Sequence, residues 1–282
     1  NGAASAFAGS GTTYSATITP AADGAVTVDV AAAAAQDTAG NDNTSATQFS
    51  IETDATAPTV VLSSVSSDPI SGVFTLDVVF SESVTGFGLG DLTVGNGAAS
   101  AFAGSGTTYS ATITPAADGA VTVDVAAAAA QDSAGNDNTA AIQFSITADG
   151  TGPTVVLSSV SSDPVSGAFS LDVVFSESVT GFGLGDLTVG NGAASAFAGS
   201  GTTYSATITP AADGAVTVDV AAAVAQDAAG NDNSAATQFS ITSDSTGPTV
   251  LLSTVSADPV SGAFTLDVVF SESVTGFAVG DL

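Results

Sequence analysis

Residues 74–80 have the sequence FTLDVVF. Large apolar side chains occupy every second position of this stretch, at Phe74, Leu76, Val78 and Phe80. Alternation with a period of two predicts a β-strand that turns one face to a core and the other to solvent. Asp77, in the middle of the stretch, is therefore expected on the solvent side.

Similar stretches surround this one and are separated by turn-forming sequences such as Asn96-Gly97 and Ala117-Asp118-Gly119. The predicted strands cover residues 59–62, 74–80, 92–94, 98–103, 109–113, 121–125 and 142–146. About seven short strands within one domain are typical of an immunoglobulin-like β-sandwich. The predicted fold class is therefore all-β.

The whole pattern repeats every 95 residues, because NGAASAFAGSGTTYSATITPAADGAVTVDVAAA begins at Asn1, Asn96 and Asn191. The copies differ most at residues 52–58, 147–153 and 242–248, where Gly and Pro occur as they do in linkers. We therefore expect complete sandwiches at residues 56–150 and 151–245, and parts of sandwiches at residues 1–55 and 246–282.

The two partial copies are expected to be complementary. Residues 1–55 contain the later strands of a sandwich and residues 246–282 its first strands. Because the first residues recur inside the chain, we expect residue 1 to be a cut in a longer array, with Leu282 of one copy close to Asn1 of the next. The copies would be joined either in one continuous polypeptide or as subunits that complement each other head to tail.

Two details concern the interior of each sandwich. The alanine-rich residues 126–130 favour a helix by propensity, but the segment is too short for a stable one, so we expect it to extend the preceding strand. The chain has no Cys to form a disulfide between the two sheets and no Trp to pack against one, so apolar packing must hold the sheets together. Five phenylalanines in each period are expected to contribute, in this copy Phe74, Phe80, Phe87, Phe102 and Phe144.

The composition excludes several classes of partner. The chain has no Lys, Arg or His and carries 28 acidic residues, which gives a formal net charge of −28. Such a chain cannot neutralise nucleic-acid phosphates or bind anionic lipid headgroups. Its apolar stretches are too short to cross a membrane. Unbalanced carboxylates favour surroundings rich in metal cations, and we expect an extracellular location.

Enzymatic activity is not expected. The usual general bases and activated nucleophiles require His, Cys or Lys, and the chain has none of them. A pair of carboxylates of the glycosidase type is chemically available, but all acidic residues except Glu52 recur from copy to copy, which is unusual for an active site.

Four segments carry a resemblance to a known family. They are TAPTVVLSS (56–64), FTLDVVFSESVTGF (74–87), GDLTVGNGAASAFAGSGTTYSATITPAADG (90–119) and AQDSAGNDN (130–138). In this order they resemble the bacterial Ig-like domains that occur in tandem in large surface adhesins and biofilm proteins. The resemblance implies a rod-like extracellular array of sandwiches arranged end to end, often stiffened by calcium near the joints.

Oxygen donors are predicted to gather at one pole of each sandwich, where the entering linker meets two loops. Calcium takes six to eight oxygen ligands from carboxylates, carbonyls and water. The candidate calcium ligands of the first joint are Asp54, Glu82, Asp91, Asp132 and Asn136. Those of the next joint are Asp149, Glu177, Asp186, Asp227 and Asn231.

The opposite pole carries Asp68 and Asp118, which would face the next linker. A simpler interpretation is open for all these acids, because Asp in a turn commonly caps its own backbone and acidic surfaces promote solubility. Asp77 and Asp124 lie in the middle of strands and are expected to be solvated charges.

Two functions fit the sequence. The first is a structural extracellular spacer or filament-forming array whose partners are neighbouring copies of the same repeat. The alternative is an adhesive module that recognises a glycan or a protein. Near-identity of the copies favours the spacer, and so does the shortage of the aromatic and Arg anchors that binding surfaces use.

Overall fold

The computed structural model describes every residue from Asn1 to Leu282, and its regular elements are strands and single turns of 3₁₀ helix. No helix in it has the length and apolarity needed to cross a membrane. The chain divides into two compact units, Asn1–Thr151 and Gly152–Leu282.

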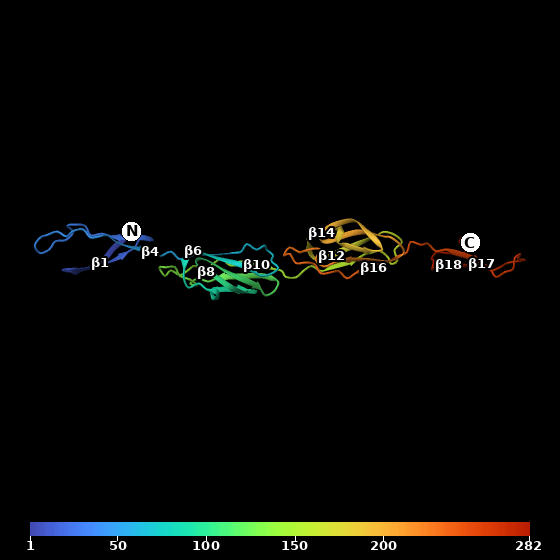
Figure 1. Cartoon of the computed structure of the whole chain (residues 1–282), viewed down its shortest axis with the longest axis horizontal. Helices are drawn as coiled ribbons and strands as arrows, with labels where there is room; N and C mark the ends of the chain where they lie inside the picture. Colours follow the sequence, from blue (N-terminus) through green and yellow to red (C-terminus); the bar gives the residue numbers. More distant parts are fainter. The chain divides into compact units, whose positions relative to one another are not determined.

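Unit 1 contains a complete sandwich of two three-stranded antiparallel sheets, drawn in cyan to green in Figure 1. The strand orders are β5-β6-β8 and β10-β9-β7. The elements are β5 (Val60–Ser63), β6 (Phe74–Val84), η1 (Leu89–Asp91), β7 (Leu92–Gly95), β8 (Gly97–Pro115), β9 (Gly119–Val125) and β10 (Phe144–Ala148).

The core lies between the central strands β6 and β9. Leu76 and Val78 of β6 are fully buried, and Val121 and Val123 of β9 are buried in the same cluster. Val79 is exposed on the outer face of β6, and Asp77 is half-buried. This alternation confirms the strand predicted from FTLDVVF, with its apolar face inward.

A cluster of aromatic rings packs on the sheet that contains β6 and β8. The rings of Phe80, Phe87, Phe102 and Tyr109 form a cluster whose centroids lie 5.1–5.9 Å apart. The Tyr109 hydroxyl donates a hydrogen bond to the Val84 carbonyl at 3.2 Å, which satisfies this buried polar group. These contacts hold β8 and the segment after β6 against β6, and the rings of Phe74 in β6 and Phe144 in β10, with centroids 5.9 Å apart, join the two sheets in a chain that has no disulfide.

Strand β8 folds back on itself as a hairpin. The Ser100 hydroxyl donates to the Thr112 carbonyl, and Gly104 lies so close to the Thr108 carbonyl that a Cβ would stand 2.3 Å from that oxygen. Gly104 also has a φ of +117°, which few other residues adopt. The predicted strands 98–103 and 109–113 are therefore the two arms of one continuous element.

Two expectations about strands were wrong. Residues 126–130 do not extend β9, which ends at Val125; they form a turn in which Ala128 has a φ of +58°. The side chain of Asn138 holds this turn, because it bonds the backbone of both Ala126 and Ala130. Ile142 lies before β10 and is exposed, because the chain is not paired there.

Unit 2 contains a second complete sandwich with its own core, and its sheets have the orders β11-β12-β14 and β13-β15-β16. Its elements lie 95 residues after those of unit 1. They are β11 (Val155–Ser158), β12 (Phe169–Val179), η2 (Leu184–Asp186), β13 (Leu187–Gly190), β14 (Gly192–Pro210), β15 (Gly214–Val220) and β16 (Phe239–Ser243).

Each unit also contains part of a further sandwich. In unit 1, β1 (Ala3–Ser10) pairs with β2 (Thr13–Thr19), and β3 (Gly24–Val28) pairs with β4 (Phe49–Thr53). In unit 2, β17 (Val250–Ser253) pairs with β18 (Asp267–Phe270), and the turn η3 (Val279–Asp281) follows. Much of the apolar face of these strands is exposed.

Candidate metal site

Glu82 enters the site from a strand. The sequence predicted Glu82 in a loop, but β6 continues through Glu82 to Val84. The Glu82 side chain is half-buried and lies near the end of this strand. Glu82 accepts no hydrogen bond from the protein. Its carboxylate therefore keeps both oxygens for another partner.

Asp132 lies in the loop between β9 and β10 and is buried. Its Oδ1 accepts hydrogen bonds from the backbone N–H groups of Ala134 at 2.8 Å and Asn136 at 2.9 Å. The Asn136 side chain donates to Oδ2 at 2.8 Å. These bonds fix the orientation of the Asp132 carboxylate.

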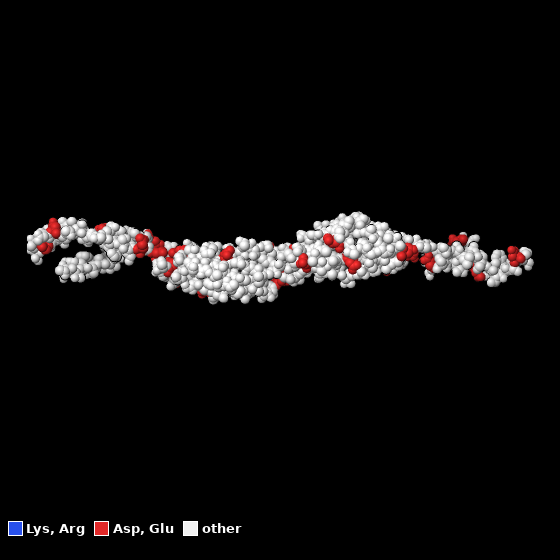
Figure 2. All heavy atoms as spheres, viewed as in Figure 1, with Lys and Arg blue, Asp and Glu red and all other residues white.

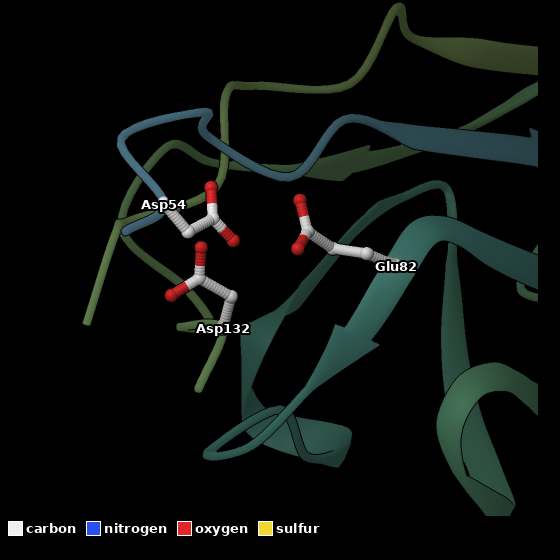
Figure 3. Close-up of side chains that lie close together, drawn as sticks. All are labelled: Asp54, Glu82 and Asp132. Atoms are coloured by element: carbon white, nitrogen blue, oxygen red, sulfur yellow. The ribbon is translucent and has the colours of Figure 1, made fainter. Parts of the chain in front are cut away.

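Asp54 comes from the linker that enters the sandwich. Its backbone carbonyl accepts a hydrogen bond from the Asn136 side chain at 3.1 Å, so one asparagine positions both Asp54 and Asp132. One carboxylate oxygen of each of Asp54, Glu82 and Asp132 lies within 4.8 Å of the other two. Figure 3 shows the three side chains pointing towards one another, from the linker, β6 and the loop.

The electrostatics of this group are unfavourable without a cation. The pKa of the Glu82 carboxyl is raised by burial and by the negative charges of Asp54 and Asp132. Burial alone would raise the pKa of Asp132, but the hydrogen bonds from Asn136 and Ala134 outweigh it and leave that pKa lowered. Hydrogen bonds thus keep Asp132 ionised. The negative charge of Asp132 in turn opposes the ionisation of Glu82 beside it.

The donor set fits a hard divalent cation. Carboxylate oxygens are ligands that calcium prefers, and a calcium ion held there would take its remaining oxygens from backbone carbonyls or water. Figure 2 shows acidic atoms gathered at the end of the unit 1 sandwich that the linker enters, and no Lys or Arg. Asp54, Glu82 and Asp132 are therefore the residues that would hold an ion.

The other two ligand candidates of this joint have different contacts. Asp91 is not part of the group of three, and its Oδ2 accepts the backbone N–H of Gly88 at 2.8 Å at the start of η1. Asn136 positions the two aspartates through its side-chain N–H groups. Their role as direct ligands stays a prediction.

The candidates of the second joint occupy equivalent positions 95 residues later. Within unit 2, Asp227 is buried and bonded by Asn231, as Asp132 is by Asn136. Glu177 lies in β12, and Asp186 accepts the N–H of Gly183 at 2.8 Å. Asp149 lies in the last residues of unit 1, where its N–H bonds the Ile70 carbonyl.

A second set of acids ties each linker to the sandwich before it, and the sequence did not predict this. The carboxylate of Asp118 accepts the N–H of Gly150 at 2.7 Å and the hydroxyl of Thr151 at 2.5 Å. Asp23 and Asp213 do the same for the linkers that contain Thr56 and Thr246. The signal was present in the sequence, because this Thr persists in all three linkers while its neighbours change.

These hydrogen bonds also hold the aspartates ionised. The side-chain hydroxyl of Thr151 and the N–H of Gly150 lower the pKa of Asp118. In unit 2 the hydroxyls of Ser245 and Thr246 lower the pKa of Asp213 to about 2. We call this contact between a turn aspartate and the following linker the linker latch.

The bacterial Ig-like domain family matches residues 54–147 and again residues 149–242. The chain belongs to this family. No curated protein is significantly similar to this bacterial Ig-like chain in sequence.

Three solved structures are similar to this bacterial Ig-like chain. Invasin, a bacterial integrin-binding protein, is 15% identical over 85% of this chain and 50% of its own, with a TM-score of 0.37. A tetra-tandem repeat from the extending region of a large adhesion protein is 20% identical over 96% of this chain and 81% of its own, with a TM-score of 0.27. The adhesin InvE of Yersinia pseudotuberculosis is 14% identical over 66% of this chain and 58% of its own, with a TM-score of 0.25. The chain thus spans half the length of the invasin chain.

Proposed function

We propose that this bacterial Ig-like chain is a structural extracellular array, a surface spacer of the adhesin or biofilm type, in which calcium stiffens the joints between sandwiches. Family membership and the near-identical tandem sandwiches support the structural role. The absence of His, Cys and Lys argues against catalysis.

The contacts of the first linker support a stiff joint. On the side of the preceding strands, Asp23 accepts the N–H of Ala55 at 2.8 Å and the hydroxyl of Thr56. On the side of the following sandwich, Asn136 bonds the Asp54 carbonyl, and Ser81 accepts the N–H of Thr59. A linker bonded on both sides loses the freedom that flexible linkers have. We infer an end-to-end arrangement of successive sandwiches.

The observation that carries the calcium proposal is the group of Asp54, Glu82 and Asp132. Three carboxylates converge without a cationic side chain, and burial together with the repulsion between them raises the pKa of Glu82. A bound calcium ion supplies the missing positive charge. Because the three ligands come from the linker, a strand and a loop, binding would fix the linker to the sandwich that follows it.

The alternative, an adhesive module for a glycan or a protein, has less support. The complete sandwich of unit 1 has a depression of about 170 Å³ lined by Ile70, Val73, Pro115 and Asp118. Ligand pockets commonly measure about 300–1,000 Å³ and present aromatic side chains. This depression is smaller and has no aromatic lining.

Thermal unfolding with and without calcium tests the proposal. Removal of calcium by EDTA is expected to lower the Tm of the wild-type chain, because a ligand that binds only the folded state stabilises it by about 2.7 kcal/mol when its free concentration is 100 times Kd. In the double variant Glu82→Gln, Glu177→Gln the Tm should not respond to calcium. In EDTA that variant should melt above the wild type, because it lacks the buried, repelled charge that burial and the neighbouring aspartates disfavour at Glu82.

The matched control is the double variant Asp77→Asn, Asp172→Asn, which removes two acids from the middle of β6 and β12. It should respond to calcium as the wild type does. A wild-type Tm that is the same in calcium and in EDTA would contradict the proposal, and so would an equal calcium response in all three chains.

A further inference from the structure

The candidate metal site and the first linker latch meet at three consecutive residues. Asp54 contributes a carboxylate to the group of three acids. The next two residues donate to Asp23, Ala55 through its N–H at 2.8 Å and Thr56 through its hydroxyl. Asp23 lies in the turn between β2 and β3 and therefore belongs to the strands that precede the linker. The linker is thus bonded to those strands directly beside a candidate metal ligand.

Hydrogen bonds of Asp54 itself join the two features. Its Oδ1 accepts the N–H of Thr56 at 3.0 Å, which holds the carboxylate against the residue whose hydroxyl bonds Asp23. Its carbonyl accepts a hydrogen bond from the side chain of Asn136, which also bonds the Asp132 carboxylate. A continuous series of hydrogen bonds therefore runs from Asp23 through the linker to Asp132.

Asp23 is placed to position this group and not to bind the ion. Both of its carboxylate oxygens accept hydrogen bonds from the linker, Oδ1 from Ala55 and Oδ2 from Thr56. Its negative charge still reaches Glu82, whose pKa is raised by burial and by three neighbouring aspartates, of which Asp23 is one. Asp23 can therefore act on an ion in two ways, by attraction through its charge and by alignment of the linker through the latch.

The three linkers preserve what this arrangement needs. Each has an Asp and, two residues later, a Thr, while the residue between them is Ala, Gly or Ser. In each linker the Asp accepts the N–H of the Thr at 3.0–3.2 Å, and the middle residue donates its N–H to the latch. A backbone donor permits the middle side chain to change. The preserved pairs are Asp54 and Thr56, Asp149 and Thr151, and Asp244 and Thr246.

We propose that the metal site and the linker latch of the first joint are coupled, with Asp23 and Thr56 as positioning residues for the calcium ion. This inference rests on the proposed calcium function. A closed latch holds the Asp54 carboxylate where the ion needs it, and a bound ion holds Asp54 where the latch closes. Such coupling is reciprocal, so each event strengthens the other by the same factor. One ion then fastens the linker both to the strands before it and to the sandwich after it.

The Ala55 amide reports on both events. It lies next to Asp54 and donates to Asp23, and its signal is distinct because the equivalent residues are Gly150 and Ser245. NMR titration of the metal-free chain with calcium, followed at this amide, therefore measures the Kd of the first joint. The rate at which the same amide exchanges with solvent measures how often the latch opens.

Thr56→Val removes the latch hydroxyl but keeps the charge of Asp23 and every candidate ligand. We expect it to raise the Kd by about fivefold, the lower end of typical coupling between sites. Thr56→Ser retains the hydroxyl and should bind as the wild type does. Because coupling is reciprocal, calcium should slow exchange of the Ala55 amide in the wild type by a similar factor. Thr56 is exposed, so neither substitution disturbs the core.

The matched control is Thr151→Val, which removes the equivalent hydroxyl from the latch of Asp118 and should leave the Kd measured at Ala55 unchanged. A Thr56→Val chain that binds calcium with the wild-type Kd would overturn the coupling while the proposed function stands, since Asp23 would then act through its charge alone. Equal weakening by Thr151→Val would also overturn it. A wild type whose Ala55 signal does not respond to calcium would overturn both the coupling and the proposed function.

Discussion

Asn138 is a buried polar residue that organises the loop carrying Asp132. Its Oδ1 accepts the N–H of Ala130 at 2.7 Å, and its Nδ2 donates to the carbonyls of Ala126 at 3.0 Å and Thr139 at 2.8 Å. One side chain thus replaces the strand pairing that the loop backbone lacks. Small alanines suit the turn around it, because they allow the backbone to pass close to the amide.

Substitution of this residue should be costly. Asn138→Ala leaves buried backbone groups without partners, each at about 1–3 kcal/mol, so we expect the unit 1 sandwich to lose on the order of 3 kcal/mol of unfolding free energy. Urea unfolding measures this loss. Asn43 makes the same bonds in the partial sandwich but is less buried, so Asn43→Ala is the control and should have a smaller effect. Equal losses in the two variants would contradict this role.

At the scale of the elements, the linker latch joins a turn to the linker that follows it. Sequence alone predicted acidic residues at this pole but not their partners, because the latch joins positions more than 30 residues apart. The same limit applies to Glu82, whose placement depends on how far β6 continues.

Strand alternation is local, and it was therefore predictable from the sequence. The turn at residues 126–130 depends on the distant Asn138, so propensity and length could not predict it.

The latch makes a prediction about pH. The pKa of Asp213 in the folded chain is about 2, below its ordinary value of 3.8, so the latch contributes stability above the ordinary value that is lost as the pH falls through 2. In Ser245→Ala, Thr246→Val the pKa of Asp213 should rise towards 3.8, because both hydroxyl donors are removed. Carbon-detected NMR titration of the carboxylate measures both values.

The control for this titration is Ser240→Ala, a substitution in β16 away from the latch, which should leave the Asp213 titration unchanged. A wild-type Asp213 that titrates near its ordinary pKa, or a double variant that titrates like the wild type, would show that the hydroxyls do not hold the carboxylate.

At the scale of the whole molecule, the repeat predicts the same chemistry at every joint. The family match, the two separate cores and the 95-residue period all describe one unit used in tandem. A chain without a single basic side chain cannot neutralise its own carboxylates. External cations are the remaining source of positive charge, and Asp54, Glu82 and Asp132 of unit 1 each bring a carboxylate oxygen within 4.8 Å of the other two.

Calorimetric titration of the metal-free chain with calcium tests this account most directly. We predict saturable binding in the wild type and in Asp77→Asn, Asp172→Asn, and loss of that binding in Glu82→Gln, Glu177→Gln. Loss is expected because Glu82→Gln removes one charged candidate ligand from the group of Asp54, Glu82 and Asp132, and Glu177→Gln removes the equivalent glutamate of β12. Absence of calcium binding by the wild type, or unchanged binding by the glutamine variant, would contradict the account.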